Sequence, residues 1–203
     1  LVMEYVEGTL LYQLVVSSPG KFLHPLQAVD ISLQVARALE HAHQRGVVHR
    51  DIKPENILIT TIGGQTDFVK VLDFGVARVI GQPPLTRVGE EIIGTPEFIA
   101  PEMMSASGEL SPSVDLYALG IMLHDTIVGE PPWRGDIKEI LNGHMNVVPP
   151  RLSDRRKDAL IPRELDELAA QLLEKNPNRR PTATETVEIL TRIRALLPAR
   201  SVQ

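Results

Sequence analysis

The chain contains 203 residues with a formal net charge of −5, and 43% of its residues are hydrophobic. This length is sufficient for one domain with a substantial core, and the negative balance argues against an overall basic face for nucleic acid. The chain has no cysteine, which excludes disulfides and thiolate metal sites. No apolar run approaches the roughly 20 residues that span a bilayer. No secretory signal opens the chain, so we expect a cytoplasmic protein, with a membrane anchor outside this chain left open.

The first predicted elements follow from apolar spacing and from the position of proline. Residues 1–8 form an apolar, β-rich segment, and residues 9–16 are expected to form a short helix. A long helix is predicted over residues 25–45, because apolar residues recur at three- and four-residue spacing after a proline in the first turn. His41 and His43 are two positions apart and face different sides of this helix. We therefore interpret them as surface or core histidines rather than metal ligands.

The rest of the chain is predicted to contain a small hairpin followed by helices. Residues 57–59 and 68–72 are expected to be strands joined by a glycine-containing turn. The predicted helices that follow cover residues 113–128, 136–144, 162–174 and 182–197. One basic cluster alternates with aspartates, so we interpret it as a solvated face: Arg151, Arg155, Arg156 and Lys157. The pattern indicates a mainly α fold (α+β overall) with small β-hairpins.

One stretch carries most of the chemical information in the sequence. Residues 49–56 read His-Arg-Asp-Ile-Lys-Pro-Glu-Asn. The proline prevents a helix through the middle and favours an extended conformation at Lys53, so the loop can aim Asp51, Lys53 and Asn56 at a common point. An acid that takes a proton, a cation, and an amide oxygen for a hard metal ion are the groups that phosphoryl transfer requires.

Two further motifs follow in order, Asp-Phe-Gly at 73–75 and Ala-Pro-Glu at 100–102. The ordered set resembles the signature of protein kinases. The chain looks like the C-terminal lobe of a eukaryotic-type (Hanks-type) serine/threonine protein kinase of bacterial type. In this resemblance residues 1–8 are the hinge and the end of the last N-lobe strand, residues 9–198 are the C-terminal lobe, and residues 199–203 are a tail.

The resemblance implies transfer of the γ-phosphoryl group of ATP to serine or threonine hydroxyls of protein substrates, with Mg²⁺ as the metal. Asp51 would be the catalytic base, and Lys53 would neutralise charge on the transferred group. Asn56 and Asp73 would bind Mg²⁺. His49 would be a structural hydrogen-bonding residue rather than a proton shuttle.

The resemblance also implies where the nucleotide base binds. Met3 would be the gatekeeper, and backbone groups of Glu4 and Val6 would meet the edge of adenine. Leu58 would form the floor beneath the base. An ordinary edge strand is the alternative interpretation of these first residues.

The activation segment would run over residues 73–102. Thr86 is the candidate autophosphorylation site, because it is the hydroxyl residue between the metal-binding aspartate and Thr95. Thr95 would help to line the substrate platform and favours serine or threonine acceptors over tyrosine. Glu91 stands where many related kinases carry a phosphorylated threonine, so its carboxylate could meet Arg50 and hold the segment partly ordered. Two solvated surface acids are the alternative.

Three residues would have supporting roles in this family. Glu102 is expected to form a buried ion pair with Arg180, and Asp115 is expected to bond the backbone of the catalytic loop (residues 49–56). Asp115 also suits the first turn of its predicted helix, where the helix dipole favours an acid.

Two features leave the activity open. Neither a glycine-rich loop nor a Val-Ala-Ile-Lys-like lysine precedes the hinge, so the N-terminal lobe is expected to be absent from this sequence and the isolated fragment to be inactive. The alternative function is a catalytically inert truncated lobe or a pseudokinase that acts as a protein-interaction module. A small-molecule phosphotransferase is disfavoured by residues 94–102, which serve peptide substrates in this family. A homodimer for autophosphorylation is a possible assembly.

Overall fold

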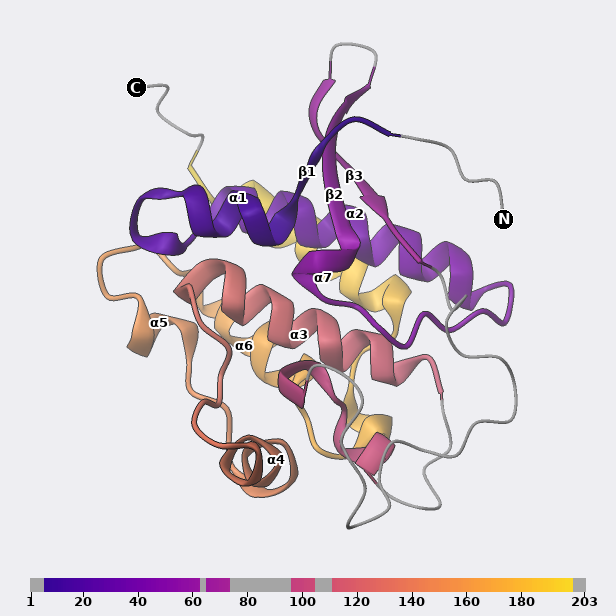
Figure 1. Ribbon diagram of the computed structural model, residues 1–203, viewed down its shortest axis with the longest axis vertical. Coiled ribbons are helices and arrows are strands. Elements are labelled where there is room, and N and C mark those ends of the chain that lie inside the picture. The colour runs from indigo at the N-terminus through magenta and orange to yellow at the C-terminus, as the bar shows by residue number, and fades with distance from the viewer. Residues whose placement is uncertain (1–5, 63–64, 74–95, 105–110, 199–203) are drawn as a thin grey trace.

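The computed structural model describes residues 6–62, 65–73, 96–104 and 111–198, and Figure 1 shows their arrangement. The α-helices in these ranges are α1 (Leu11–Ser17), α2 (Pro25–His43), α3 (Ser113–Val128), α4 (Ile137–Asn146), α5 (Leu152–Arg155), α6 (Arg163–Leu172) and α7 (Ala183–Leu196). The strands are β1 (Thr9–Leu10), β2 (Ile57–Ile62) and β3 (Gln65–Val71). Short 3₁₀ turns lie at η1 (Pro19–Lys21), η2 (Pro54–Asn56), η3 (Pro96–Phe98), η4 (Pro101–Met104) and η5 (Pro177–Arg179).

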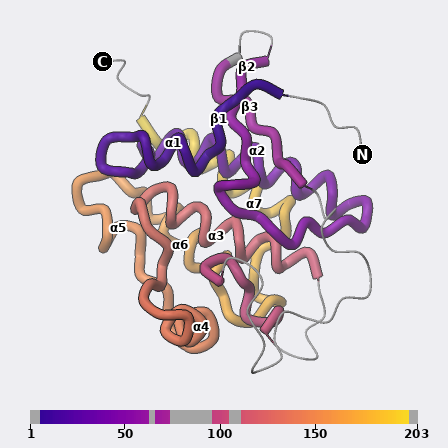
Figure 2. Tube along the Cα trace, viewed as in Figure 1, coloured from indigo at the N-terminus to yellow at the C-terminus, as the bar shows by residue number. Residues whose placement is uncertain are grey.

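Helix α3 is the central support of the molecule, and it crosses the middle of the trace in Figure 2. Almost every residue from Val114 to Ile127 is buried. Gly120 allows close approach of the end of α6, because a Cβ atom there would lie 2.8 Å from Leu172 Cβ. A helix that is apolar on all sides is stable only when other elements surround it, so α3 is a rigid base for whatever its side chains hold.

Helix α2 begins at Pro25 and ends at His43, two residues before the predicted end. Its apolar residues, including Leu33, Ala36 and Leu39, are buried in the main core. This core also contains residues of α3, α6 and α7. The predicted apolar stripe therefore packs α2 against the other long helices.

The sheet has the order β1-β2-β3 and is antiparallel throughout. Thr9 pairs with Ile59, so the prediction of a helix over residues 9–16 was wrong at its start, and α1 begins at Leu11. The cause is tertiary: Thr60 Oγ1 donates a hydrogen bond of 2.5 Å to the carbonyl of Glu7. This contact holds the preceding segment against β2. The sheet and α4 lie at opposite ends of the long axis (Figure 1).

The predicted solvated basic face was wrong at Arg156, which is only 7% exposed. Its guanidinium lies 3.5 Å from the centre of the Phe22 ring and pairs with Asp158. It also donates to the carbonyl of Ile127, in the last turn of α3. The last carbonyls of a helix have no partner within the helix. The bond from Arg156 gives the Ile127 carbonyl such a partner, which explains why this arginine is buried. None of the helices in the described ranges has both the length and the apolar character that crossing a membrane requires.

Candidate active site

The loop at residues 49–56 connects α2 to β2 and reverses direction at Pro54. Lys53 is extended, with φ −162° and ψ 162°, as expected for a residue before proline. The 3₁₀ turn η2 follows, and the Asn56 N–H donates to the carbonyl of Lys53 at 2.9 Å. This reversal brings Asn56 back to the start of the loop, where Asp51 lies.

Asp51, Lys53 and Asn56 are in direct contact. Lys53 Nζ lies 2.9 Å from Asp51 Oδ2. The Asn56 amide nitrogen donates to the Asp51 carbonyl at 2.7 Å and to Oδ2 at 2.9 Å. The Asp51 side chain is 57% exposed, so it remains open to a substrate. Neither of these bonds uses the amide oxygen of Asn56.

Asp115 of α3 holds the beginning of the loop through its backbone. Its carboxylate accepts hydrogen bonds from the N–H of His49 at 2.8 Å and from the N–H of Arg50 at 2.7 Å. The side chain is fully buried. Arg50 has a φ of +70°, a left-handed conformation that is costly for a residue with a side chain. The two bonds to Asp115 therefore hold the backbone in an unfavourable geometry just before Asp51.

His43 is a third partner of Asp115 that the sequence interpretation missed. Its Nε2 lies 2.8 Å from Asp115 Oδ2. His43 is in the last turn of α2, so the contact joins α2, α3 and the loop. The sequence contained one usable signal, a histidine six residues before His49, but only the fold shows that it reaches a carboxylate 72 positions away.

His49 connects the loop to the segment that carries Asp73. Its Nδ1 accepts from the Asp51 N–H at 3.2 Å, so the proton is on Nε2, which donates to the carbonyl of Leu72 at 2.8 Å. The Leu72 N–H in turn donates to the carbonyl of Asn56 at 2.8 Å. Both ring nitrogens of His49 are occupied by backbone groups, which leaves no ring nitrogen for shuttling a proton.

Asp73 follows Leu72 directly and therefore lies beside the catalytic loop. Its side chain is exposed and its φ is +56°. Carboxylate and amide oxygens are the ligands that Mg²⁺ prefers, and Mg²⁺ usually takes only one or two protein carboxylates together with water and phosphate oxygens. Asp73 and Asn56 fit this donor set. Within the part of the chain that the structure describes, no cluster of three or more histidine, cysteine or acidic side chains forms a separate metal site.

An acidic group of side chains lies next to the loop. Burial, together with the negative charges of Glu55, Glu130 and Glu97, raises the pKa of Asp125 to about 6. Glu55 belongs to η2 and Glu97 to η3. Glu55 and Glu97 thus both raise the pKa of Asp125, a residue of α3.

These contacts have the arrangement that the three motifs predict for a phosphotransferase. Residues 1–189 match the family described as protein kinase domain. The chain belongs to the protein kinase family. Its kinase relatives include serine/threonine-protein kinase pkn3 of Myxococcus xanthus, which is 40% identical over 190 residues. These residues cover 91% of this chain and 34% of the relative.

Other protein kinases are also similar to this chain in sequence and in structure. Serine/threonine-protein kinase PknB of Mycobacterium leprae is 35% identical over 98% of this chain and 31% of its own length. The crystal structure of a mutant form of the Mycobacterium tuberculosis PknI kinase domain has a TM-score of 0.67 and 27% identity. That match covers 95% of this chain and 64% of the other. The chain thus has the protein kinase fold, and it spans about a third of the length of the curated relatives that it matches.

The kinase ion pair expected between Glu102 and Arg180 is present and is bidentate. Arg180 Nη1 lies 2.5 Å from Oε1, and Nη2 lies 2.8 Å from Oε2. The arginine side chain is fully buried. It also donates to the backbone carbonyls of Ser113, Glu174 and Lys175. The pair joins η4 to the start of α3 and to the segment before α7.

Of the remaining residues that the kinase resemblance predicts, the structure describes two, Leu58 and Val6. Leu58 is 7% exposed and lies against Gly8, whose Cβ would come within 2.9 Å of Leu58 Cγ. Val6 is half-buried in the segment that leads to this contact. The other expected residues lie outside the described residues: Met3, Glu4, Thr86, Glu91 and Thr95.

Proposed function

We propose that the protein is a serine/threonine protein kinase and that this chain is the C-terminal lobe of its kinase domain. The observation that carries the proposal is the convergence of Asp51, Lys53 and Asn56 within hydrogen-bonding distance, with Asp73 on the adjoining segment. The kinase relatives support the same activity.

The exposed carboxylate of Asp51 serves as the base. Hydrogen bonds from Lys53 and Asn56 fix its direction. It accepts the proton of a substrate hydroxyl as that oxygen approaches the γ-phosphorus. Because Lys53 can turn from Asp51 toward a phosphate oxygen without leaving the loop, its charge stabilises the transferred group in the transition state.

Asn56 and Asp73 are the residues that would hold Mg²⁺ with ATP. Bound Mg²⁺ supplies neutralisation of charge on the phosphates. The chain orients these two ligands through the backbone: Leu72 is fixed between Asn56 and His49, so Asp73 has little freedom relative to the loop. This preorganisation lowers the cost of assembling the site when the nucleotide arrives.

The proposal extends to the residues around this centre. Leu58 forms the floor under adenine, and the backbone at Glu4 and Val6, with Met3 before it, meets the edge of the base. Arg50 is the proposed partner of an acidic group in the activation segment. Its buried Nε has no hydrogen-bond partner in the described part of the chain, which supports pairing with an acidic group.

In the same proposal the activation segment provides that acidic group and the substrate platform. Glu91 supplies the carboxylate that meets Arg50, and Thr86 is the site of autophosphorylation. Thr95 bonds toward Asp51 and lines the platform, which favours serine and threonine acceptors.

Labelled phosphate transfer tests the proposal. The full-length protein is incubated with Mg-ATP carrying a γ-³²P label and with dephosphorylated casein, and the phosphorylated amino acids are identified. The wild type should yield phosphoserine and phosphothreonine, and Asp73→Asn should lose the transfer. Asp154→Asn is the matched control, because Asp154 is exposed and lies outside the site. Nucleotide binding without any transfer by the wild type would identify a pseudokinase and refute the proposal.

A further inference from the structure

The segment just before β1 is attached to β2 by a side-chain hydrogen bond. Thr60, a buried residue of β2, donates from Oγ1 to the carbonyl of Glu7 at 2.5 Å. Glu7, Gly8 and Thr9 are themselves exposed. An exposed stretch of chain that makes few buried contacts opens easily, so the position of this segment depends on its bonds to β2.

The residues after Glu7 are attached to the same strand through the backbone. Thr9 pairs with Ile59 in the antiparallel ladder. At Gly8 a Cβ atom would lie 2.6 Å from the Ile59 carbonyl oxygen, so a residue with a side chain could not run this close to β2. Backbone contacts therefore hold the chain from Gly8 onward, and the bond from Thr60 extends the attachment by one residue toward Val6.

This extension leads to the place where the proposed function puts the base of ATP. Leu58, the proposed floor beneath adenine, is two positions before Thr60 on β2, so the two side chains are on the same face of the strand. Val6, whose backbone is proposed to meet the edge of the base, directly precedes Glu7. A fixed carbonyl at Glu7 limits the rotation of the adjoining peptide groups relative to this floor.

The orientation of these peptide groups decides which purine they can bind. Adenine presents an amino donor at C6, whereas guanine presents a carbonyl acceptor there. A backbone N–H only donates and a carbonyl only accepts, so a segment held in one orientation suits one of the two bases. A segment that is already ordered also binds its proper base more tightly, because less conformational freedom is lost on binding.

The Thr60 side chain is suited to ordering this segment. A threonine in a strand is β-branched and has few rotamers, which restricts the direction of its hydroxyl. Its acceptor belongs to an exposed residue, so water could replace the hydroxyl if it were removed, and little stability would be lost. Loss of this bond would therefore affect the freedom of the chain at Val6 more than the stability of the fold.

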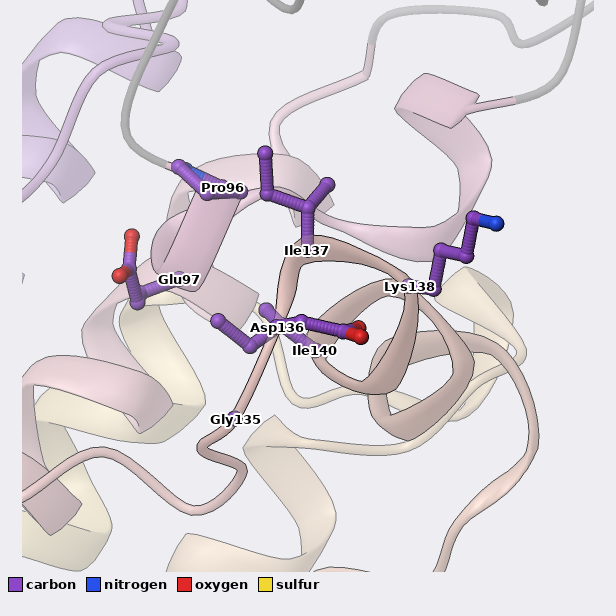
Figure 3. Close-up of a pocket in the computed structure, with 7 residues that line it drawn as sticks. All are labelled: Pro96, Glu97, Gly135, Asp136, Ile137, Lys138 and Ile140. Atoms are coloured by element: carbon purple, nitrogen blue, oxygen red, sulfur yellow. The ribbon is translucent and has the colours of Figure 1, made fainter.

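A cavity of about 520 Å³ lies elsewhere, between η3 and the start of α4, and Figure 3 shows its lining. Pro96 and Glu97 form one side, and residues 135–138 with Ile140 form the other. The sheet and α4 lie at opposite ends of the long axis (Figure 1). An exposed residue of this cavity, Lys138, therefore provides a control site remote from β2.

We propose that Thr60 is a positioning residue for recognition of the nucleotide base. Its hydroxyl holds the carbonyl of Glu7, so that the backbone at Val6 meets the edge of adenine in one orientation. Thr60 acts through Glu7 and sets the preference for adenine over guanine. The inference rests on the part of the proposed function that assigns the base to Val6 and Leu58.

Equilibrium binding of fluorescent nucleotides to the full-length protein tests the inference. The probes are Mg²⁺ complexes of ATP and GTP that carry an N-methylanthraniloyl group on the ribose, which leaves the base edges free. The wild type should bind the ATP probe more tightly. Thr60→Val keeps the shape of the side chain and should reduce this preference about three- to tenfold, the range expected for the loss of one hydrogen bond. Thr60→Ser keeps the hydroxyl and should restore the preference.

Two controls separate positioning from general damage to the fold. Thr61→Val makes the same change at the neighbouring, exposed residue, and Lys138→Met changes the remote cavity. Both should keep the wild-type ratio of the two Kd values. Because the ratio compares two probes on the same protein, a loss of folded molecules does not alter it. If Thr60→Val does not fold, Thr60→Ala should give the same reduced ratio.

An unchanged ratio in Thr60→Val, or failure of Thr60→Ser to restore it, would overturn the inference. A wild type that binds both probes equally, or binds neither, would also overturn it. The assay needs no phosphate transfer, so the two proposals can fail separately. Selective binding that depends on Thr60 in a protein that transfers no phosphate would refute the proposed kinase function, whereas phosphate transfer with an unchanged ratio would refute only the role of Thr60.

Discussion

The catalytic loop and helix α4 are both attached to one turn of α3, but by different means. Asp115 holds the loop by accepting two backbone N–H groups. Tyr117, two residues later and so on another side of the helix, holds α4 through the side chain of His144. Backbone bonds fix a chain path whatever side chains it carries, whereas the second attachment depends on one imidazole. The comparison indicates that the path of residues 49–50 tolerates side-chain changes within the loop, whereas the position of α4 is sensitive to the loss of one side chain.

The largest expected effect concerns the ion pair between Glu102 and Arg180, whose arginine also donates to the Ser113 carbonyl at the start of α3. Arg180→Ala leaves the carboxylate of Glu102 without its partner in a site where the arginine was fully buried. Removing one partner of a buried pair costs about 3–5 kcal/mol, so urea denaturation should show a loss of this size. Arg163→Ala, in an exposed helical pair, should leave the midpoint unchanged.

A double variant makes this prediction sharper. Glu102→Gln with Arg180→Met removes both charges, so it should be more stable than Arg180→Ala alone. Equal losses in the single and double variants would mean that the pair is not the source of the effect.

The second prediction concerns the pH dependence of stability at α4. The pKa of His144 is about 4 in the folded protein, below its usual 6.5, so the unfolded chain binds the proton more readily. This contribution to stability is complete above pH 6.5 and is lost as the pH falls toward 4, by about 3 kcal/mol. Urea titrations at pH 7 and pH 4.5 measure it.

The control for the pH effect is His144→Gln, which cannot titrate. Asp125 acts in the opposite direction, because its raised pKa of about 6 favours the folded state as the pH falls. Asp125 is present in both proteins, so the difference between them isolates His144. An identical pH dependence in the two proteins would contradict a buried neutral imidazole.

A smaller effect is expected at Asp115. Asp115→Asn keeps one carbonyl oxygen where the carboxylate had two, so the N–H of His49 or of Arg50 loses its acceptor. A buried unsatisfied donor costs about 1–3 kcal/mol. Because Arg50 precedes the base, kcat should fall while KM for ATP is retained. A variant with unchanged kcat would show that the backbone geometry at Arg50 is not maintained by Asp115.

The smallest effect is expected at His43, which contacts Asp115 but not the loop itself. His43→Ala should lower the free energy of unfolding by about 1 kcal/mol, the net value of a typical hydrogen bond, and should reduce kcat less than Asp115→Asn does. His41→Ala, on the same helix and exposed, is the comparison. A larger loss of kcat in His43→Ala than in Asp115→Asn would contradict the view that Asp115 holds the loop directly and His43 acts only through Asp115.

The same two regions explain what could be predicted from the sequence. Asp51, Lys53 and Asn56 lie within six consecutive residues, so their convergence could be predicted from their spacing and from Pro54. The helices predicted over residues 113–128 and 182–197 match α3 and, to within one residue at each end, α7, because continuous apolar character and a terminating proline are local signals too. His144 and Tyr117 are 27 positions apart, and no local pattern relates them. Arg156 was misjudged because its burial depends on Phe22 and on a carbonyl of α3, which are tertiary partners.

The measurement that tests the central claim most directly is the kinetics of Asp51→Asn in the full-length protein. The asparagine keeps the size of the side chain and its contact with Asn56 but cannot accept the hydroxyl proton. We predict that kcat falls by about 10²- to 10⁴-fold while KM for ATP stays within about twofold, since Asp51 does not bind the nucleotide in this account. Transfer at the wild-type rate by Asp51→Asn would contradict the assignment of this site.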